Sequence, residues 1–265
     1  MGGIEVALVK LGGSVVTDKS KLRSFAGKNA SMLLGELSKF LGARDSRRAI
    51  VVHGGGSFGH IIAKRFSISE GFQRDSQLAG FAEVRNDMRD LNSRLIASMR
   101  SLSLPAISFP PESLFRIESR RIVFTDISAA LKGLEIGLIP VSFGDAVIDM
   151  QRSFTILSGD TIMEELSRIV RPSVSIFCTD VDGVFSSDPK SSAKSSLLRH
   201  LTAGTKLVAG SATVDDVTGG MEGKLRVLFE VAKYSGRTYV VNGRKPGRLL
   251  RALQGRSVTG TEVFG

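Results

Sequence analysis

The chain has 265 residues, of which 42% are hydrophobic and 23% charged, and it carries a formal net charge of +10. A chain of this length can bury a sizeable core, either in one large α/β unit or in two lobes that share a sheet. Its single cysteine, Cys178, excludes an internal disulfide, and no apolar stretch approaches the roughly 20 residues that cross a bilayer.

Short apolar runs rich in β-branched residues alternate with amphipathic segments of helical length, which is typical of a parallel sheet between helical layers. In chain order, strands are predicted at residues 5–11, 48–53, 106–109, 138–142, 174–179 and 238–242. Helices are predicted at residues 25–41, 57–66, 77–101, 126–135, 159–169, 221–235 and 246–253. Residues 116–124 and 146–155 are predicted as hairpins that add to the sheet, and residues 186–196 as a surface loop. The fold class is therefore α/β, a three-layer αβα sandwich with a mostly parallel central sheet and added hairpins.

The charge and the N-terminus bear on location and partners. Lysines and arginines are scattered in ones and twos, and aromatic residues make up only 6%, so we expect no nucleic-acid partner. The positive charge suits a site that attracts multiply charged phosphates. The N-terminus lacks a secretory signal pattern, so a cytoplasmic protein without a membrane partner is expected.

Glycine clusters follow the first two strands. Lys10 stands directly before the glycines at 12–13, and paired glycines let backbone N–H groups approach an anion closely because no Cβ blocks the path. The glycines at 54–56 lead into a helix N-terminus, where N–H groups and the helix dipole both favour phosphate. His60 lies about one turn into that helix and can reach the same anion with a ring N–H. His53 ends a strand inside the turn and is expected to hold the loop geometry.

Two further clusters lie in the second half of the chain. Residues 158–160 (Ser-Gly-Asp) begin a helix, and residues 179–184 follow a buried strand. Residues 216–224 again place glycines before a helix, with Lys224 in its first turn. The pattern is neither a Rossmann fingerprint nor a Walker A loop. Four such junctions, with two lysines and two or three carboxylates, provide what phosphoryl transfer requires.

Six stretches carry these motifs along nearly the whole chain: VKLGGSVVTDK at 9–19, VVHGGGSFGH at 51–60, PVSFGDAV at 140–147, SGDTIM at 158–163, TDVDGVFSSDPK at 179–190 and DVTGGMEGK at 216–224. In this order they resemble the amino acid kinase superfamily and, within it, the archaeal-type isopentenyl phosphate kinases. The GGGSFGH element narrows the resemblance to acceptors that carry a phosphate or phosphonate. The resemblance implies an ATP-dependent kinase that forms isopentenyl diphosphate, with Mg²⁺ as a second cofactor and a homodimer as its assembly.

The resemblance also implies a role for each matching residue. Catalysis is expected of Lys10, Lys19, His60, Asp160 and Lys224, with the two lysines at 10 and 224 on the transferring phosphoryl group. The nucleotide is expected to contact Gly12, Gly13, Gly56, Thr179, Asp180, Gly220 and Lys224. The acceptor phosphate is expected to contact Gly55, His60 and Gly159. No residue is assigned as a metal ligand.

The two halves of the chain divide these tasks. Residues 1–171 are expected to form an acceptor-binding lobe that also dimerises, and residues 172–265 a nucleotide-binding lobe, with one continuous sheet through both. An acceptor phosphate has a second pKa of about 6, so its attacking oxygen needs no general base at neutral pH. We therefore expect His60 to position the acceptor phosphate rather than to remove a proton.

The isoprenoid tail of such an acceptor requires an apolar slot. Phe81, Val84 and Met88 recur at helical spacing on the predicted helix 77–101, and Phe81 and Val84 are candidates for control of chain length. Three alternatives remain open: a kinase of the same fold with another acceptor (fosfomycin, uridylate or an amino acid), a non-catalytic nucleotide or metabolite sensor, and a nucleic-acid-binding protein. Both lysines and Asp160 argue against a sensor, and His60 argues against uridylate and amino acid acceptors.

Overall fold

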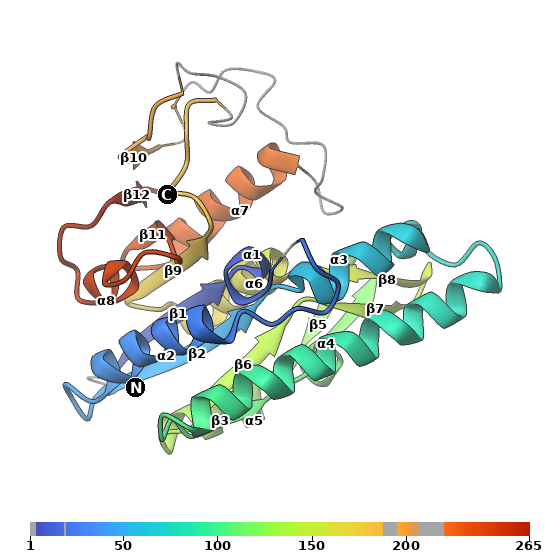
Figure 1. The fold of residues 1–265 in the computed structure, drawn as a ribbon, viewed down its shortest axis with the longest axis horizontal. Helices are drawn as coiled ribbons and strands as arrows, with labels where there is room; N and C mark the ends of the chain where they lie inside the picture. The colour runs from blue at the N-terminus through green and yellow to red at the C-terminus, as the bar shows by residue number, and fades with distance from the viewer. Residues whose placement is uncertain (1–3, 19, 188–194, 203, 206–219) are drawn as a thin grey trace.

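The computed structural model describes residues 4–18, 20–187, 195–202, 204–205 and 220–265, and of Gly220 and Met221 it describes the backbone alone. Eight strands form the central sheet: β1 (Glu5–Leu11), β2 (Arg47–His53), β3 (Ala106–Ser108), β6 (Ile139–Phe143), β9 (Val174–Thr179), β10 (His200–Leu201), β11 (Thr238–Asn242) and β12 (Gly260–Val263). Their order is β10-β12-β11-β9-β1-β2-β6-β3 (Figure 1). Within this sheet, β11 and β12 pair antiparallel and the other neighbours pair in parallel.

The helices are α1 (Gly13–Val16), α2 (Gly27–Leu41), α3 (Gly56–Arg65), α4 (Ser76–Arg100), α5 (Ser128–Glu135), α6 (Gly159–Val170), α7 (Gly220–Tyr234) and α8 (Arg248–Leu253), with 3-10 turns η1 (Ile68–Glu70) and η2 (Pro111–Ser113). The predicted strands and helices are all found, with ends that differ by at most two residues. Among the described residues, no helix combines the length and apolar character needed to span a membrane.

Alternate residues of the central strands face opposite helical layers. On β1, Ala7, Val9 and Leu11 belong to the core that α2, α8 and the second half of α4 cover. Val6 and Leu8 belong to the core that α5, α6 and α7 cover. Side chains on a strand alternate between faces, so a β1 that is apolar throughout can be buried on both sides. The α/β three-layer arrangement predicted from the sequence is confirmed.

The predicted hairpins are present, but they form a second sheet instead of extending the central one. Its strands are β4 (Phe115–Glu118), β5 (Arg121–Thr125), β7 (Asp145–Asp149) and β8 (Ser153–Leu157), in the order β5-β4-β7-β8. The chain leaves the central sheet at Gly144, whose N–H donates to the His53 carbonyl at 3.0 Å. A Cβ on Gly144 would lie 2.9 Å from the amide nitrogen of Gly159, so only glycine allows this close passage beside the start of α6.

The short elements β10, η1 and η2 were not predicted, and neither were α1 and β12, because two to four residues are too few to show a period. Tertiary contacts hold α1 and β12 in place. Asn29 Nδ2 donates to the carbonyl of Val15 in α1 at 2.7 Å. In β12, Thr261 Oγ1 donates to the Leu198 carbonyl at 2.6 Å and accepts from the Val184 N–H at 2.8 Å.

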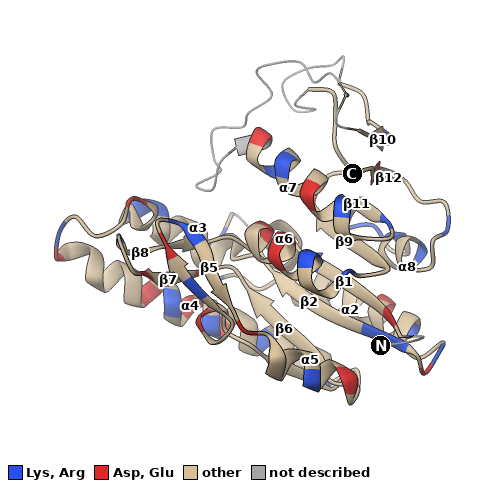
Figure 2. Cartoon of the chain, turned by 180° about the vertical axis from the view of Figure 1, so that it is seen from behind, with Lys and Arg blue, Asp and Glu red and all other residues tan. Residues whose placement is uncertain are grey.

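Charged residues are spread over the fold. Figure 2 shows lysines and arginines interspersed with acidic residues on several helices and loops. The net charge of +10 is therefore not confined to one element.

Candidate active site

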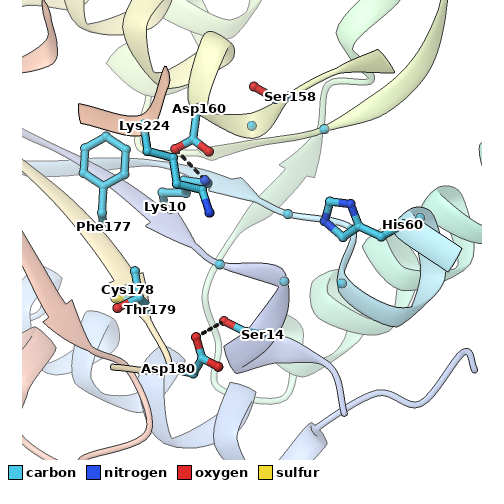
Figure 3. Close-up of a pocket in the computed structure, with 18 of the residues that line it drawn as sticks. Lys10, Ser14, His60, Ser158, Asp160, Phe177, Cys178, Thr179, Asp180 and Lys224 are labelled. Carbon is cyan, nitrogen blue, oxygen red and sulfur yellow. Dashed lines mark hydrogen bonds and ion pairs between the residues drawn. The ribbon is translucent and has the colours of Figure 1, made fainter. Parts of the chain in front are cut away.

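Strands β1, β2 and β9 end side by side and open onto one cavity. Leu11, the last residue of β1, pairs with His53, the last of β2, and with Cys178 near the end of β9. The loops that follow therefore begin at the same edge of the sheet. With the first turns of α3 and α6 and part of α7, these loops line a cavity of about 870 Å³ (Figure 3).

The loops after β1 and β2 approach each other so closely that both need glycine. A Cβ on Gly54 would lie 2.7 Å from the amide nitrogen of Gly13, and a Cβ on Gly13 would overlap the backbone of Gly56. Gly56 has a φ of +48°, a left-handed conformation that strains other residues. Thr17 ties the loops together, since its hydroxyl donates to the Gly13 carbonyl at 2.7 Å and accepts from the Ser57 N–H at 3.0 Å. The glycines therefore serve loop packing, whatever they contribute to anion binding.

An ion pair lies at the end of β1. The Nζ of Lys10 is 2.7 Å from Oδ1 of Asp160, and the two side chains are only 14% and 19% exposed. Asp160 lies in the first turn of α6, where Ser158 caps the helix by accepting from the Thr161 N–H at 3.0 Å. Figure 3 shows Lys10, Asp160 and Lys224 pointing toward one another from β1, α6 and α7. Because this region is partly shielded from water, its charges act strongly on a bound anion.

His60 lies on the other side of the cavity, on α3 (Figure 3). The wall on this side is largely apolar and includes Val84 and Met88 of α4 and Ile156 of β8. Val84 and Met88 are each 1% exposed. One cavity therefore combines a polar end, where phosphates can bind, with an apolar extension beyond the histidine.

The two predicted tail residues differ in position. Val84 lines the cavity, whereas Phe81 is absent from its described lining. The ring of Phe81 stacks on Phe154 with centroids 5.0 Å apart, within the same hydrophobic cluster as Val84. Phe81 therefore packs against the residues of the apolar wall on the side away from the cavity.

The loop after β9 forms another wall of the cavity. Asp180 Oδ1 accepts a hydrogen bond from Ser14 Oγ at 2.9 Å, and Thr179 Oγ1 donates to the Val181 carbonyl at 3.0 Å. Arg244, after β11, donates from Nη2 to the Ser14 carbonyl at 2.8 Å. The loop after β1 is therefore joined to the second half of the chain at both the side chain and the backbone of Ser14.

The structure brings most of the predicted site residues together. Those that line the cavity are Lys10, Gly12, Gly13, Gly55, Gly56, His60, Val84, Gly159, Asp160, Thr179, Asp180 and Lys224. Gly220 begins α7, with only its backbone described. Lys19 and residues 216–219 lie outside the described residues.

Several lining residues were given no role from the sequence, among them Ser14, Asp145 and Phe177. Ser14 and Asp145 stand inside the quoted stretches 9–19 and 140–147, so the motifs contained a signal for them. Burial raises the pKa of Asp145 to about 6. The guanidinium of Arg89, whose Nη1 lies 2.9 Å from Oδ2 of Asp145, opposes this shift. The ring of Phe177 lies 5.9 Å from the Nζ of Lys10 and covers that ammonium group.

His53 supports the loop, as the sequence analysis expected. It is fully buried, and burial lowers its pKa to about 4, although a contact with the Gly54 carbonyl opposes the shift. Its Nδ1 donates to that carbonyl at 3.2 Å, and its Nε2 accepts from Asn92 Nδ2 at 3.2 Å. The ring is therefore neutral at neutral pH and adds no charge to the site.

The described residues contain no cluster of three or more histidine, cysteine or acidic side chains that could hold a metal ion.

Comparison with known proteins identifies close relatives. Residues 5–242 match the model of the amino acid kinase family. An isopentenyl phosphate kinase of Methanothermobacter thermautotrophicus is 34% identical over 265 aligned positions, which cover 97% of this chain and 98% of the relative. An X-ray structure of isopentenyl phosphate kinase matches with a TM-score of 0.84 and 30% identity, over 97% of this chain and 99% of that one. A crystal structure of an isopentenyl phosphate kinase substrate complex matches with a TM-score of 0.80 and 29% identity, over 98% of this chain and 100% of that one.

The packing of the glycine loops predicts the effect of one added methyl group. Gly13→Ala should lower the free energy of unfolding by more than about 2 kcal/mol, because its Cβ would force the two loops apart. Gly35→Ala is the matched control, since a Cβ there meets nothing within 4 Å and alanine favours the α2 helix. Urea unfolding of both variants measures the difference. Equal stability of the two variants would contradict the proposed loop packing.

Proposed function

This chain belongs to the amino acid kinase family, and on that premise we propose that it is an isopentenyl phosphate kinase. It transfers the γ-phosphoryl group of ATP to isopentenyl phosphate and releases isopentenyl diphosphate and ADP. The observation that carries the proposal is the composition of one cavity, with lysines and glycine loops at one end and a histidine with an apolar wall at the other. Full-length similarity to proteins named isopentenyl phosphate kinase supports this acceptor.

The transfer is a direct in-line displacement. An oxygen of the acceptor phosphate attacks the γ-phosphorus, and the bond from that phosphorus to the β–γ bridging oxygen breaks. Because the attacking oxygen is already ionised near neutral pH, the main barrier is repulsion between two polyanions. Lys10 and Lys224 stabilise the charge that spreads over the transferring group, and Asp160 orients Lys10 through their 2.7 Å contact.

The glycine loops hold the nucleotide phosphates by backbone N–H groups, in the roles proposed for Gly12, Gly13, Gly56 and Gly220. Thr179 and Asp180 contribute to nucleotide binding from the loop after β9, and we propose that Lys19 assists from the first loop. Mg²⁺ bound with ATP supplies further neutralisation of phosphate charge. This proposal divides the chain into an acceptor-binding half, residues 1–171, and a nucleotide-binding half, residues 172–265.

His60, Gly55 and Gly159 hold the acceptor phosphate in this proposal. A Cβ on Gly55 would lie 2.9 Å from the sulfur of Met88, so the loop fits closely against the apolar wall. His60 donates a hydrogen bond to the phosphate and aligns it for attack. The isoprenoid tail then lies along Val84, Met88 and Ile156.

We propose a cytoplasmic homodimer as the working form. Exposed apolar side chains on the second sheet support self-association: Val123, Phe124 and Ile148 are 49%, 52% and 51% exposed. Light scattering in solution distinguishes a dimer from a single chain of 28.4 kDa. The proposed use of ATP supports the cytoplasm as the site of reaction.

The function is tested by a coupled assay of ADP release with ATP and Mg²⁺. Isopentenyl phosphate should be the preferred acceptor over fosfomycin, UMP and glutamate, because it fits both the phosphate site and the apolar wall. Lys224→Ala, which removes one cation from the transferring group, should lower kcat at least about 100-fold and controls for contaminating kinases. Preference for another acceptor on that panel would overturn the assignment.

The role of His60 predicts a graded series of variants. His60→Ala should lower kcat/KM for isopentenyl phosphate about 100-fold, because an oriented donor to an anion is lost. His60→Asn and His60→Gln retain an N–H donor and should keep more activity than the alanine variant. His200→Ala, at an exposed histidine of β10, is the control and should behave as the wild type. Equal loss in all three His60 variants would instead indicate proton transfer.

The apolar wall predicts which substitution changes chain-length preference. Val84→Ala should raise activity with longer prenyl phosphates, because Val84 lines the cavity. Phe81→Ala should have a smaller effect, since its ring stacks on Phe154 behind that wall. Steady-state kinetics with a series of prenyl phosphates compares the two variants. A broader range with Phe81→Ala alone would show that the slot lies elsewhere.

A further inference from the structure

We propose that Glu164 and Arg226 are positioning residues, which set Lys224 of α7 at its place beside Lys10 and Asp160. This inference rests on the proposed phosphoryl-transfer function. It assigns a task to two side chains that lie outside the cavity. They act through the helices that carry the catalytic groups.

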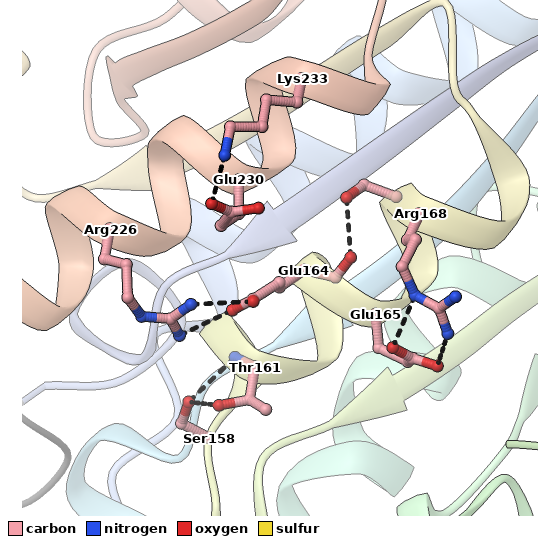
Figure 4. A network of polar contacts seen from close by, with 9 residues as sticks. Ser158, Thr161, Glu164, Glu165, Arg168, Arg226, Glu230 and Lys233 are labelled. Carbon is pink, nitrogen blue, oxygen red and sulfur yellow. Dashed lines mark hydrogen bonds and ion pairs between the residues drawn. The ribbon is translucent and has the colours of Figure 1, made fainter. Parts of the chain in front are cut away.

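Glu164 and Arg226 form a two-pronged contact between α6 and α7. Arg226 Nη1 and Nη2 donate to the two carboxylate oxygens of Glu164 at 2.9 Å and 2.8 Å (Figure 4). A planar guanidinium that meets both oxygens of a carboxylate fixes direction as well as distance. The contact therefore restrains how α7 lies along α6.

Each partner stands close to a residue of the proposed catalytic site. Glu164 lies four residues after Asp160, which puts both on the same face of α6 one turn apart. Arg226 lies two residues after Lys224 near the start of α7. A shift of α7 along α6 would therefore move Lys224 relative to Asp160 by a similar amount.

The two helices run in the same direction. Arg226 meets Glu164 near the middle of both helices, and near their C-terminal ends the guanidinium of Arg171 lies 5.5 Å from the ring centroid of Tyr234. Both N-termini therefore point toward the phosphate end of the cavity. Their dipoles add to the positive potential there.

The other described contacts between these helices leave their register less defined. Leu225 and Leu228 of α7 share a hydrophobic cluster with Ile162 and Leu166 of α6, and apolar packing is not directional. The other ion pairs drawn in Figure 4 each lie within one helix, Arg168–Glu165 on α6 and Lys233–Glu230 on α7. The Glu164–Arg226 pair, by contrast, joins the two helices.

Because the Glu164–Arg226 pair is partly exposed, we expect it to affect the position of α7 more than the free energy of unfolding. The Arg226 and Glu164 side chains are 60% and 28% exposed, so their attraction is weakened by water and contributes little to the free energy of unfolding. A small displacement of a catalytic group, by contrast, can lower the rate strongly. We therefore expect substitutions here to affect kcat far more than the melting temperature.

The test measures the steady-state kinetics of Arg226→Gln and Arg226→Lys. The lysine variant keeps the positive charge but cannot donate to both carboxylate oxygens of Glu164 in the geometry of a guanidinium. Both variants should lower kcat at least about tenfold, with KM for the acceptor and the melting temperature nearly unchanged. Arg226→Lys should retain more activity than Arg226→Gln. The exchanged pair Glu164→Arg with Arg226→Glu should recover part of the loss seen in Glu164→Arg alone.

Matched controls come from the same helices. Lys233→Gln removes an ion pair within α7, and Arg168→Gln removes one within α6, so both should keep wild-type kcat. Hydrogen exchange gives a readout that does not need the acceptor. Amides of residues 222–228 should exchange faster in Arg226→Gln than in the wild type, and at the wild-type rate in Lys233→Gln.

The outcomes separate this inference from the proposed function. If the wild type does not phosphorylate isopentenyl phosphate, the proposed function fails, and the exchange measurement still tests the contact. If Arg226→Gln keeps kcat within about twofold of the wild type, or exchanges at the wild-type rate, the positioning role is wrong. The same conclusion follows if the exchanged pair recovers nothing.

Discussion

The near contact between the glycine loops after β1 and β2 is the constraint on which the site depends. Neighbouring parallel strands lie about 4.8 Å apart, and here they end level with each other at Leu11 and His53. The loops that follow these strands lie so close together that a Cβ on either Gly13 or Gly54 would clash with the backbone of the other loop. The two glycine loops are therefore fixed as one unit, and Thr17 forms hydrogen bonds to both.

The groups around these loops differ in charge according to their position. Charged side chains face the cavity, and the side chain that supports the loops from below is neutral. His53 lies beneath the loops and stays neutral, because burial lowers its pKa to about 4. The ammonium group of Lys10 is directed by Asp160, whose carboxylate lies 2.7 Å away. In the proposed function, a phosphate that binds Lys10 would therefore compete with the carboxylate of Asp160 for this lysine.

The parts of the structure that sequence could predict are those with a local cause. Strand ends, glycine clusters and helix starts follow from periodicity and backbone chemistry. Lys10, His60 and Asp160, which stand at such positions, all line one cavity. Tertiary contacts decided the rest. Helical spacing put Phe81 and Val84 on one face of α4, but only the packing of Phe81 on Phe154 showed which of them reaches the cavity. The second sheet likewise depends on the tight passage at Gly144, which no strand pattern reveals.

The two halves of the chain contact each other in two ways, by pairing of strands within the sheet and by packing of a helix on its surface. Within the sheet, β9 pairs with β1 through backbone hydrogen bonds, so the loop that carries Asp180 is held rigidly beside Ser14. The helix that carries Lys224 packs against that sheet through side chains such as Leu228 and Val231. Backbone pairing tolerates most substitutions, whereas side-chain packing does not. The alignment of the transferring phosphoryl group should therefore be more sensitive to changes between α6 and α7 than to changes in the strands.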